Sequence, residues 1–127
     1  MPKQYNQLPQ VAFSILLALS LKPRHGYEIM KQVAEDSNEK IKLVPGALYA
    51  SIKLLNEQGL VEEIDDDQDK RRRYYRLTDK GREKLNAELQ YYDNTLKLAK
   101  QRKVYDSILG ISAWTTYSGA FHSTQSY

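Results

Sequence analysis

Residues 45–80 read PGALYASIKLLNEQGLVEEIDDDQDKRRRYYRLTDK. The start of this stretch predicts a helix over residues 45–58, because Pro45 suits a first turn and Gly59 suits the position just after a last turn. Leu60 is then expected to pack back against that helix. The apolar residues recur at helical spacing on one face: Leu48, Ile52 and Leu55. The other side of the helix is small or polar: Gly46, Tyr49, Ala50 and Lys53.

Two short strands are predicted next, over residues 60–64 and 73–77, with Tyr75 and Leu77 on one face of the second strand. The polar loop between them ends in consecutive basic residues: Lys70, Arg71, Arg72 and Arg73. A helix followed by a hairpin with a basic tip is the layout of a winged helix-turn-helix. Such a unit offers DNA a helix for the major groove and a wing for the backbone. We therefore predict a mainly α fold with a small antiparallel β-hairpin.

Two further helices are predicted ahead of this stretch. Residues 11–21 are apolar nearly all round, so a helix there is expected to be buried on most sides, with Pro23 stopping it. Residues 25–37 predict a second helix. Its apolar stripe is expected at helical spacing: Tyr27, Met30 and Val33, or Ala34 in place of the last.

A long helix is predicted over residues 79–103, with Thr78 as its N-cap. Its apolar residues alternate at spacings of four and three, the pattern of a heptad seam: Leu85, Leu89, Tyr92, Leu96 and Ala99. Such a short seam can pack on the domain itself, but its distance from the three-helix core favours a partner subunit. We predict a homodimer.

The chain is expected to have three parts. Residues 1–78 form a winged helix-turn-helix domain, residues 79–103 a dimerisation helix, and residues 104–127 an atypical tail. After Lys103 the tail carries one charged residue, Asp106, and is otherwise rich in Ser, Thr, Gly and aromatic residues. It could extend the preceding helix, although Gly110 weakens that prediction.

Composition narrows the possible functions. The chain has 127 residues, 41% of them hydrophobic, which is enough for one core. It contains no cysteine, which excludes disulfides, zinc fingers and thiol nucleophiles. The net charge of +3 leans basic, so the distribution of charge matters more than the sum. No signal peptide or membrane span is recognisable, and we expect a cytoplasmic protein without cofactor or metal.

Enzymatic activity is not predicted. The two histidines, His25 and His122, belong to no catalytic motif, and His25 stands where it would cap or pack against a helix. The acidic run of residues 65–69 resembles the start of a calcium-binding loop, but Lys70 stands where that loop requires glycine.

Three separated motifs now carry a resemblance. HGYEIMKQV at residues 25–33, GALYASIKLLNEQGLVEE at 46–63 and RRRYYRLTDKGREKL at 71–85 resemble the PadR family of transcriptional regulators, in its shorter form with a single C-terminal helix. The resemblance spans roughly residues 10–103. It implies a DNA-binding winged helix and a homodimer built by the C-terminal and first helices. It also implies a repressor whose affinity for DNA falls when a small molecule binds.

The DNA-binding residues are expected on the helix of residues 45–58, which begins at Pro45. Small residues let the backbone approach DNA closely: Gly46, Ala47 and Ala50. Tyr49 and Lys53 can reach phosphates or base edges. Two structural alternatives stay open, since the small residues could serve helix packing and Tyr49 could be a half-buried prop for the wing.

The basic wing is the second expected contact with DNA. Consecutive residues on a strand alternate faces, so two or three of the four basic side chains are expected to touch phosphate. The alternative is a solvated loop whose arginines pair with the acidic residues at positions 65–69. A dimer of such units implies an inverted-repeat operator. The rival function is a winged-helix adaptor that binds protein, for which an apolar or acidic recognition face is expected instead.

Ten tyrosines in 127 residues also suggest an aromatic ligand site. Tyr91 and Tyr92 lie on the predicted dimer helix, and Trp114 is the single tryptophan. A flat aromatic effector could stack on these residues. The alternative is that the aromatic residues simply fill the dimer interface.

Overall fold

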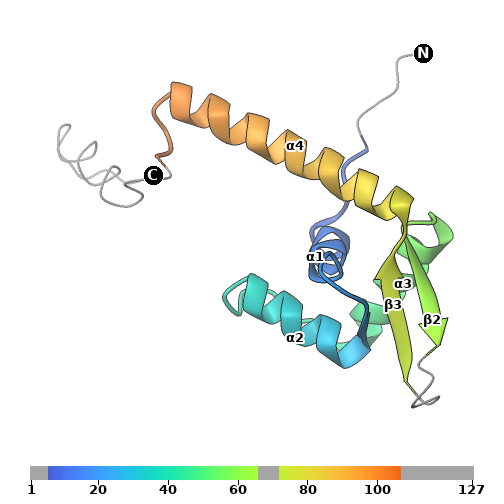
Figure 1. The fold of residues 1–127 in the computed structure, drawn as a ribbon. Coiled ribbons are helices and arrows are strands. Elements are labelled where there is room, and N and C mark those ends of the chain that lie inside the picture. The colour runs from blue at the N-terminus through green and yellow to red at the C-terminus, as the bar shows by residue number, and fades with distance from the viewer. Residues whose placement is uncertain (1–5, 66–71, 107–127) are drawn as a thin grey trace. The chain divides into compact units, whose positions relative to one another are not determined.

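The computed structural model describes residues 6–65 and 72–106 (Figure 1). It confirms the predicted winged helix-turn-helix class. Along the chain the elements are α1 (Gln10–Ala18), β1 (Arg24–His25), α2 (Gly26–Asp36), α3 (Pro45–Glu57), β2 (Val61–Asp65), β3 (Arg73–Leu77) and α4 (Asp79–Gln101). One compact unit ends at Glu88 and a second begins at Leu89, inside α4.

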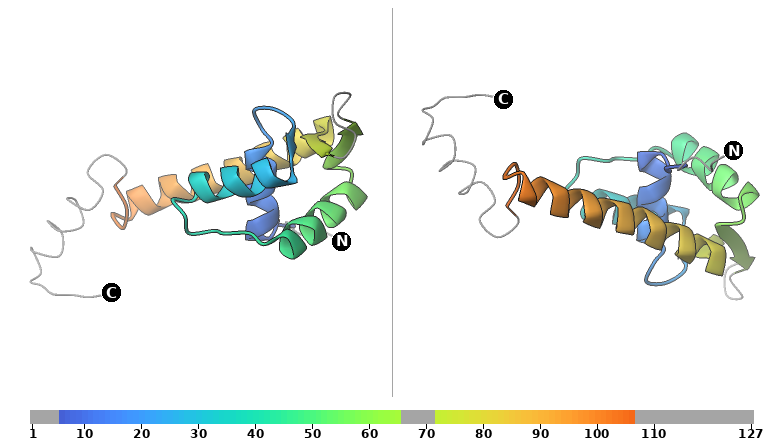
Figure 2. Two further views of the ribbon diagram at one scale, coloured as in Figure 1. Left: turned by 90° about the horizontal axis from the view of Figure 1, so that it is seen from below. Right: turned by 90° about the horizontal axis from the view of Figure 1, so that it is seen from above.

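One face of each of the first three helices builds the core of the first unit. Helix α1 packs against both α2 and α3, so the three helices surround common apolar side chains (Figure 2). The α3 face predicted from its spacing is the buried one. The buried core residues are Leu8, Ala12, Ile15, Leu16, Ala18, Leu19, Ile29, Val33, Leu48, Ile52, Leu55, Leu60, Val61, Tyr75 and Leu85.

The predicted stripe of α2 was wrong in part. Ile29 and Val33 are the fully buried pair, whereas Tyr27 is 70% exposed and Met30 is only partly buried. Residues four apart lie above one another on a helix, and residues two apart are rotated by roughly 200°. Once Ile29 faces the core, Tyr27 must therefore face away from it.

Helix α1 is shorter than predicted. It ends at Ala18, and Leu21 is 85% exposed in the following loop. Pro23 disfavours helical geometry at the residue before it. The Arg24 Nε donates a hydrogen bond of 2.7 Å to the Ala18 carbonyl, which supplies a partner for an end carbonyl of the helix.

The wing belongs to a three-stranded antiparallel sheet in the order β1-β3-β2. Strands β2 and β3 form the predicted hairpin, with Val61 opposite Leu77 and Asp65 opposite Arg73. The two-residue strand β1, absent from the predicted elements, pairs His25 with Tyr74. A strand this short has no periodicity to recognise, because only the pairing with distant β3 defines it.

Helix α3 ends in the predicted glycine cap. Gly59 has a φ of 75°, a left-handed value that glycine adopts without strain. The Leu60 N–H donates to the Leu55 carbonyl at 2.9 Å and the Gly59 N–H to the Asn56 carbonyl at 3.0 Å. This is the pair of hydrogen bonds of a Schellman motif, and it turns the chain directly into β2.

Thr78 joins the wing to α4. Its Oγ1 accepts the Gly81 N–H at 2.9 Å, as a helix N-cap does, and donates to the Gly59 carbonyl at 2.6 Å. The Thr78 N–H donates to the Leu60 carbonyl at 3.1 Å. At Gly81 a Cβ would overlap that same carbonyl and would stand 3.2 Å from Leu77 Cδ2. The first turn of α4 lies against the backbone of Leu60 because residue 81 lacks a side chain.

The N-terminal segment is attached to α4 within the first unit. The Leu8 N–H donates to the carboxylate of Glu88, a fully buried residue, and the Lys84 ammonium donates to the Asn6 carbonyl. A buried carboxylate without such donors is costly, so these bonds stabilise the segment in place. Leu85, predicted to belong to a seam, is 5% exposed and packs in the core of the first unit.

In the second unit α4 continues to Gln101 and carries an Asp93–Lys97 ion pair at 2.9 Å. Lys103 follows with a φ of 60°, and the Val104 N–H donates to the Ala99 carbonyl at 3.0 Å. Most of the predicted tail, residues 107–127, lies outside the described residues, as does the proposed helix extension. Among the helices of the described residues, none combines the length and the apolar character needed to cross a membrane.

Substitution of two first-turn glycines tests the contact between α4 and Leu60. Gly81→Ala should lower the free energy of unfolding by about 1–3 kcal/mol, because the new methyl group overlaps backbone. Gly46→Ala is the matched control. No atom lies within 4 Å of its Cβ position, so this change should raise stability by up to ~1 kcal/mol. Urea denaturation of both variants measures the difference. Equal stability of the two would contradict the contact.

Candidate nucleic-acid interface

The outward side of α3 is the first part of the candidate site. The predicted contact residues of this helix are all exposed: Pro45, Gly46, Ala47, Tyr49, Ala50 and Lys53. Gly46 and Ala50 therefore do not serve helix packing within the described residues, which removes that alternative. The first turn contains no acidic residue, and the N-cap residue Val44 makes no side-chain cap. The backbone amide groups of the first turn of α3 therefore face outward, at the positive end of the helix dipole.

The wing supplies the second part. The Arg73 Nη1 lies 3.6 Å from the Glu63 Oε2, with both side chains substantially exposed. The Arg76 guanidinium binds Glu62 through Nε at 2.6 Å and Nη2 at 2.5 Å. These partners are glutamates of β2, whereas the predicted alternative named the acidic residues at positions 65–69, of which only Asp65 lies within the described residues. An exposed pair contributes only about 0–1 kcal/mol, so the Arg73 guanidinium can exchange Glu63 for a phosphate at little cost.

Two of the four predicted wing residues, Lys70 and Arg71, lie outside the described residues. Arg72 and Arg73 lie within them, and both are exposed. Both also border a groove of about 600 Å³ that runs between α2, α3 and β3. The groove is lined by His25, Gly26, Tyr27, Tyr49, Arg72, Arg73 and Tyr75. The structure therefore brings Tyr49 together with the wing arginines.

Tyr27 and Tyr75 were not among the predicted site residues. Tyr27 was placed in the core because it fits a helical stripe, although its 70% exposure puts it on the groove. The sequence signal that could have assigned Tyr27 to the site is its position directly after Gly26, the first residue of α2. Burial raises the pKa of the Tyr75 hydroxyl above its usual 10.0, with the nearby Glu63 adding to the shift. Tyr75 therefore stays a neutral hydrogen-bond donor at ordinary pH.

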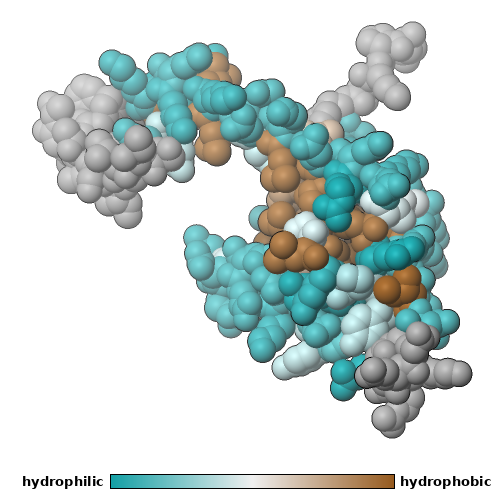
Figure 3. Space-filling view, viewed as in Figure 1, coloured by the Kyte–Doolittle hydropathy of each residue, from teal (hydrophilic) through white to brown (hydrophobic). Residues whose placement is uncertain are grey.

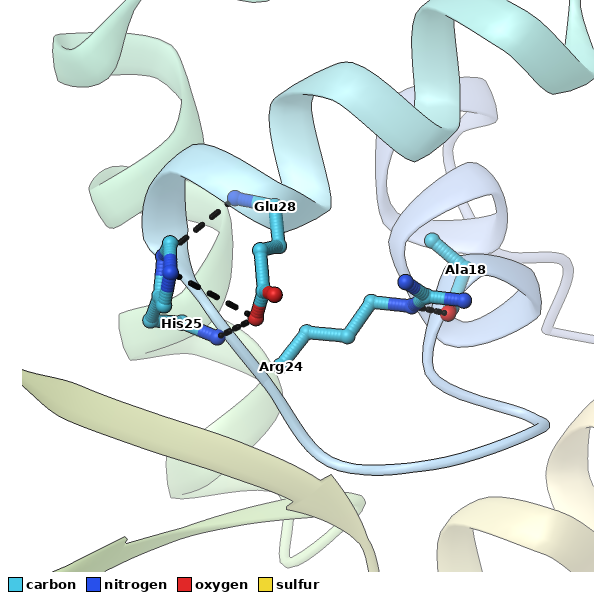
Figure 4. A network of polar contacts seen from close by, with 4 residues as sticks. All are labelled: Ala18, Arg24, His25 and Glu28. Atoms are coloured by element: carbon cyan, nitrogen blue, oxygen red, sulfur yellow. Dashed lines mark hydrogen bonds and ion pairs between the residues drawn. The ribbon is translucent and has the colours of Figure 1, made fainter. Parts of the chain in front are cut away.

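The start of α2 is held by a reciprocal cap (Figure 4). The His25 Nδ1 accepts the Glu28 N–H at 3.4 Å, and the Glu28 Oε1 accepts the His25 N–H at 3.1 Å. The His25 ring meets Tyr74 edge-on, with centroids 5.3 Å apart. His25 caps its helix and packs, as predicted, and so fixes one wall of the groove.

The seam residues of the second unit are accessible in part. Leu89 and Leu96 are 42% and 43% exposed, and Tyr92 and Ala99 are half-buried. Hydrophobic residues are visible along α4 and also over α1 in the space-filling view (Figure 3). The predicted seam is thus open from Leu89 onward, while Leu85 is already covered by the core of the first unit.

The predicted effector residues are only partly described. Tyr91 and Tyr92 form an edge-on ring pair with centroids 5.6 Å apart, and Tyr91 is 45% exposed. Trp114 lies outside the described residues. Across residues 6–65 and 72–106, no three His, Asp or Glu side chains gather in a way that could hold a metal ion.

A three-helix core whose third helix keeps one face exposed, followed by a basic wing, is the winged helix-turn-helix of transcriptional regulators. The Transcriptional regulator PadR-like family matches residues 15–87, and the chain belongs to this family. Its members are transcriptional regulators rather than enzymes, in agreement with the prediction that this chain is not an enzyme.

Individual proteins and solved structures are similar to more than half of this chain. An uncharacterised protein from Lysinibacillus sphaericus is 33% identical over 76 residues, which cover 58% of this chain and 70% of that protein. A PadR family transcription regulator from Clostridium difficile R20291 has a TM-score of 0.63 at 28% identity, over 73% of this chain and 97% of that chain. Bacillus subtilis PadR in complex with operator DNA has a TM-score of 0.56 at 23% identity, over 63% of this chain and 46% of that chain.

Proposed function

We propose that this protein is a DNA-binding transcriptional regulator that docks α3 in the major groove and its wing on the flanking backbone. The observation that carries the proposal is the shared groove of Tyr49, Arg72 and Arg73 beside the uncapped start of α3. Small exposed residues allow close approach, and arginines supply phosphate contacts. We also propose a cytoplasmic location, which is compatible with a DNA-binding role.

The rival function is a winged-helix adaptor that binds another protein. An adaptor would be expected to present an apolar or acidic face on α3. The exposed face instead carries Lys53 and Tyr49. Leu54, at 57% exposure, is the one large apolar residue besides Tyr49 exposed on α3 within the described residues. A single exposed leucine is ordinary for a protein surface and does not define a protein-binding patch.

We further propose a homodimer that binds an inverted repeat. The open part of the seam, from Leu89 to Ala99, supplies apolar side chains at heptad spacing. Three half-buried residues of α1 are also apolar: Val11, Phe13 and Leu17. Two copies related by a two-fold axis would present two α3 helices to half-sites about one turn, roughly 34–36 Å, apart.

The regulatory proposal is repression relieved by a flat aromatic effector. The Tyr91–Tyr92 ring pair offers a stacking surface on the same helix as the seam, and Trp114 is included as a third candidate. An effector can relieve repression only if it binds more tightly to a state of the protein that cannot bind the operator than to the state that can. An effector bound to Tyr91 and Tyr92 meets that condition when it changes the geometry of the dimer, because the same helix, α4, carries the seam.

Replacement of the wing arginines tests the DNA contact. Affinity for the protein's own upstream DNA should fall with salt, at a log–log slope of roughly −5 to −9 for about 6–10 neutralised phosphates. Arg72→Ala/Arg73→Ala should weaken binding at least about tenfold and reduce the slope by about 3–4, because a dimer loses four guanidinium groups. Fluorescence anisotropy at several salt concentrations measures both quantities.

The control for lost charge is Arg82→Ala/Arg102→Ala, which removes the same two charges from exposed positions of α4 and the residue after it. Its affinity and slope should match the wild type. A wild-type protein without preference for its upstream fragment over random DNA at any salt concentration would favour the adaptor instead.

Charge placed in the seam tests the dimer. Leu89→Asp/Leu96→Asp should raise the dimer dissociation constant at least about a hundredfold, because unpaired carboxylates would be buried at the interface. Sedimentation velocity at micromolar concentration should then show monomers. Gln90→Asp/Asn94→Asp introduces the same charges away from the seam and should stay dimeric. A monomeric wild type would rule out this interface.

An aromatic probe tests the effector site. Saturating 8-anilinonaphthalene-1-sulfonate should weaken operator binding by the wild type about five- to a hundredfold, the usual range for an allosteric coupling. Tyr91→Ala should abolish this response while leaving operator affinity without the probe unchanged. The same probe effect in both proteins would place the ligand elsewhere.

A further inference from the structure

The glycine that opens α2 lies against the exposed face of α3. A Cβ at Gly26 would overlap the hydroxyl oxygen of Tyr49 and would stand 3.1 Å from its Cζ. Leu48 Cδ2 would be 3.3 Å away. Gly26 is itself buried, whereas Tyr49 keeps 48% of its surface exposed. The Tyr49 ring therefore lies across the first turn of α2 with one side open to solvent.

The backbone of Gly26 does not explain why glycine stands there. Of the described glycines, Gly59 alone has a positive φ, and Gly26 is the first residue of a regular helix. Alanine is ordinarily more favourable than glycine at a helical position by about 0.5–1 kcal/mol. What alanine would change is the space occupied by Tyr49, so the missing side chain serves that contact.

The position of the Tyr49 hydroxyl matters for the groove. Tyr49 lines it together with Arg72 and Arg73. A neutral hydroxyl beside guanidinium groups is suited to donate to a DNA phosphate. A ring pushed out of this place could not make that contact.

We infer that Gly26 is a positioning residue for DNA binding, because its lack of a Cβ holds the Tyr49 hydroxyl in the groove beside the wing arginines. The inference rests on the proposed DNA-binding function. Gly26 touches no DNA in this arrangement and acts through Tyr49 alone. Its effect on affinity must therefore disappear when the Tyr49 side chain is removed.

A double-mutant cycle tests this dependence. Gly26→Ala should weaken operator binding at least about tenfold in the wild-type background, because a dimer loses one hydrogen bond to a charged group in each subunit. In the Tyr49→Ala background the same change should alter affinity less than about twofold, since the overlap is gone. Tyr49→Phe, which keeps the ring, should weaken binding as Gly26→Ala does.

Salt dependence distinguishes positioning from a general loss of structure. The log–log slope of Gly26→Ala should equal that of the wild type, because a neutral hydroxyl releases no counterion. The slope should fall in Arg72→Ala/Arg73→Ala. Gly26→Ala that lowers affinity equally in both backgrounds, or that leaves wild-type affinity unchanged, would overturn the inference.

Two other variants test the inference if Gly26→Ala alone fails to fold. Gly26→Ala/Tyr49→Ala should then unfold at the same temperature as Tyr49→Ala, and Tyr49→Phe reports whether the hydroxyl contributes to affinity. Unfolding of the double variant, or full affinity of Tyr49→Phe, would overturn the inference. A wild type that does not prefer its upstream fragment overturns the proposed function and this inference together, whereas normal wild-type binding with an inert Gly26→Ala overturns the inference alone.

Discussion

The close approach of α4 to the Leu60 backbone is the constraint on which the wing and both flanking helices depend. The Leu60 carbonyl accepts the Thr78 N–H, and the same threonine caps α4 and binds the Gly59 carbonyl. These contacts tie the end of α3, both strands of the wing and the start of α4 into one joint. Because a Cβ at Gly81 would overlap that carbonyl, the joint closes only with glycine there.

Arginines of the wing form ion pairs with glutamates in the absence of DNA. Arg73 and Arg76 each contact a glutamate of the neighbouring strand. Exposed pairs of this kind are weak, so DNA can replace the carboxylates without a large penalty. The net charge of +3 is therefore a poor guide to DNA binding, and the arrangement of Arg72, Arg73 and Tyr49 around one groove is a better one.

The family and the fold were predictable because their signals are local. The spacing of Leu48, Ile52 and Leu55 selects the buried face of α3, and Gly59 marks its end through the left-handed φ that it adopts. The basic residues Arg72 and Arg73 mark the start of β3. Each signal lies within one helical turn or one hairpin, where neighbours in sequence are also neighbours in space.

By itself, the sequence determined the three-helix order, the hairpin, the caps at His25 and Thr78 and the exposed face of α3. Only the tertiary structure decided which candidates meet. In that structure Tyr27 lines the groove rather than the core, and Leu85 packs in the core rather than in the open seam. Strand β1 pairs with β3, which lies far along the chain. The tertiary structure also sets Gly26 beneath Tyr49. Contacts between residues distant in sequence leave no periodic pattern, because they depend on how whole elements pack.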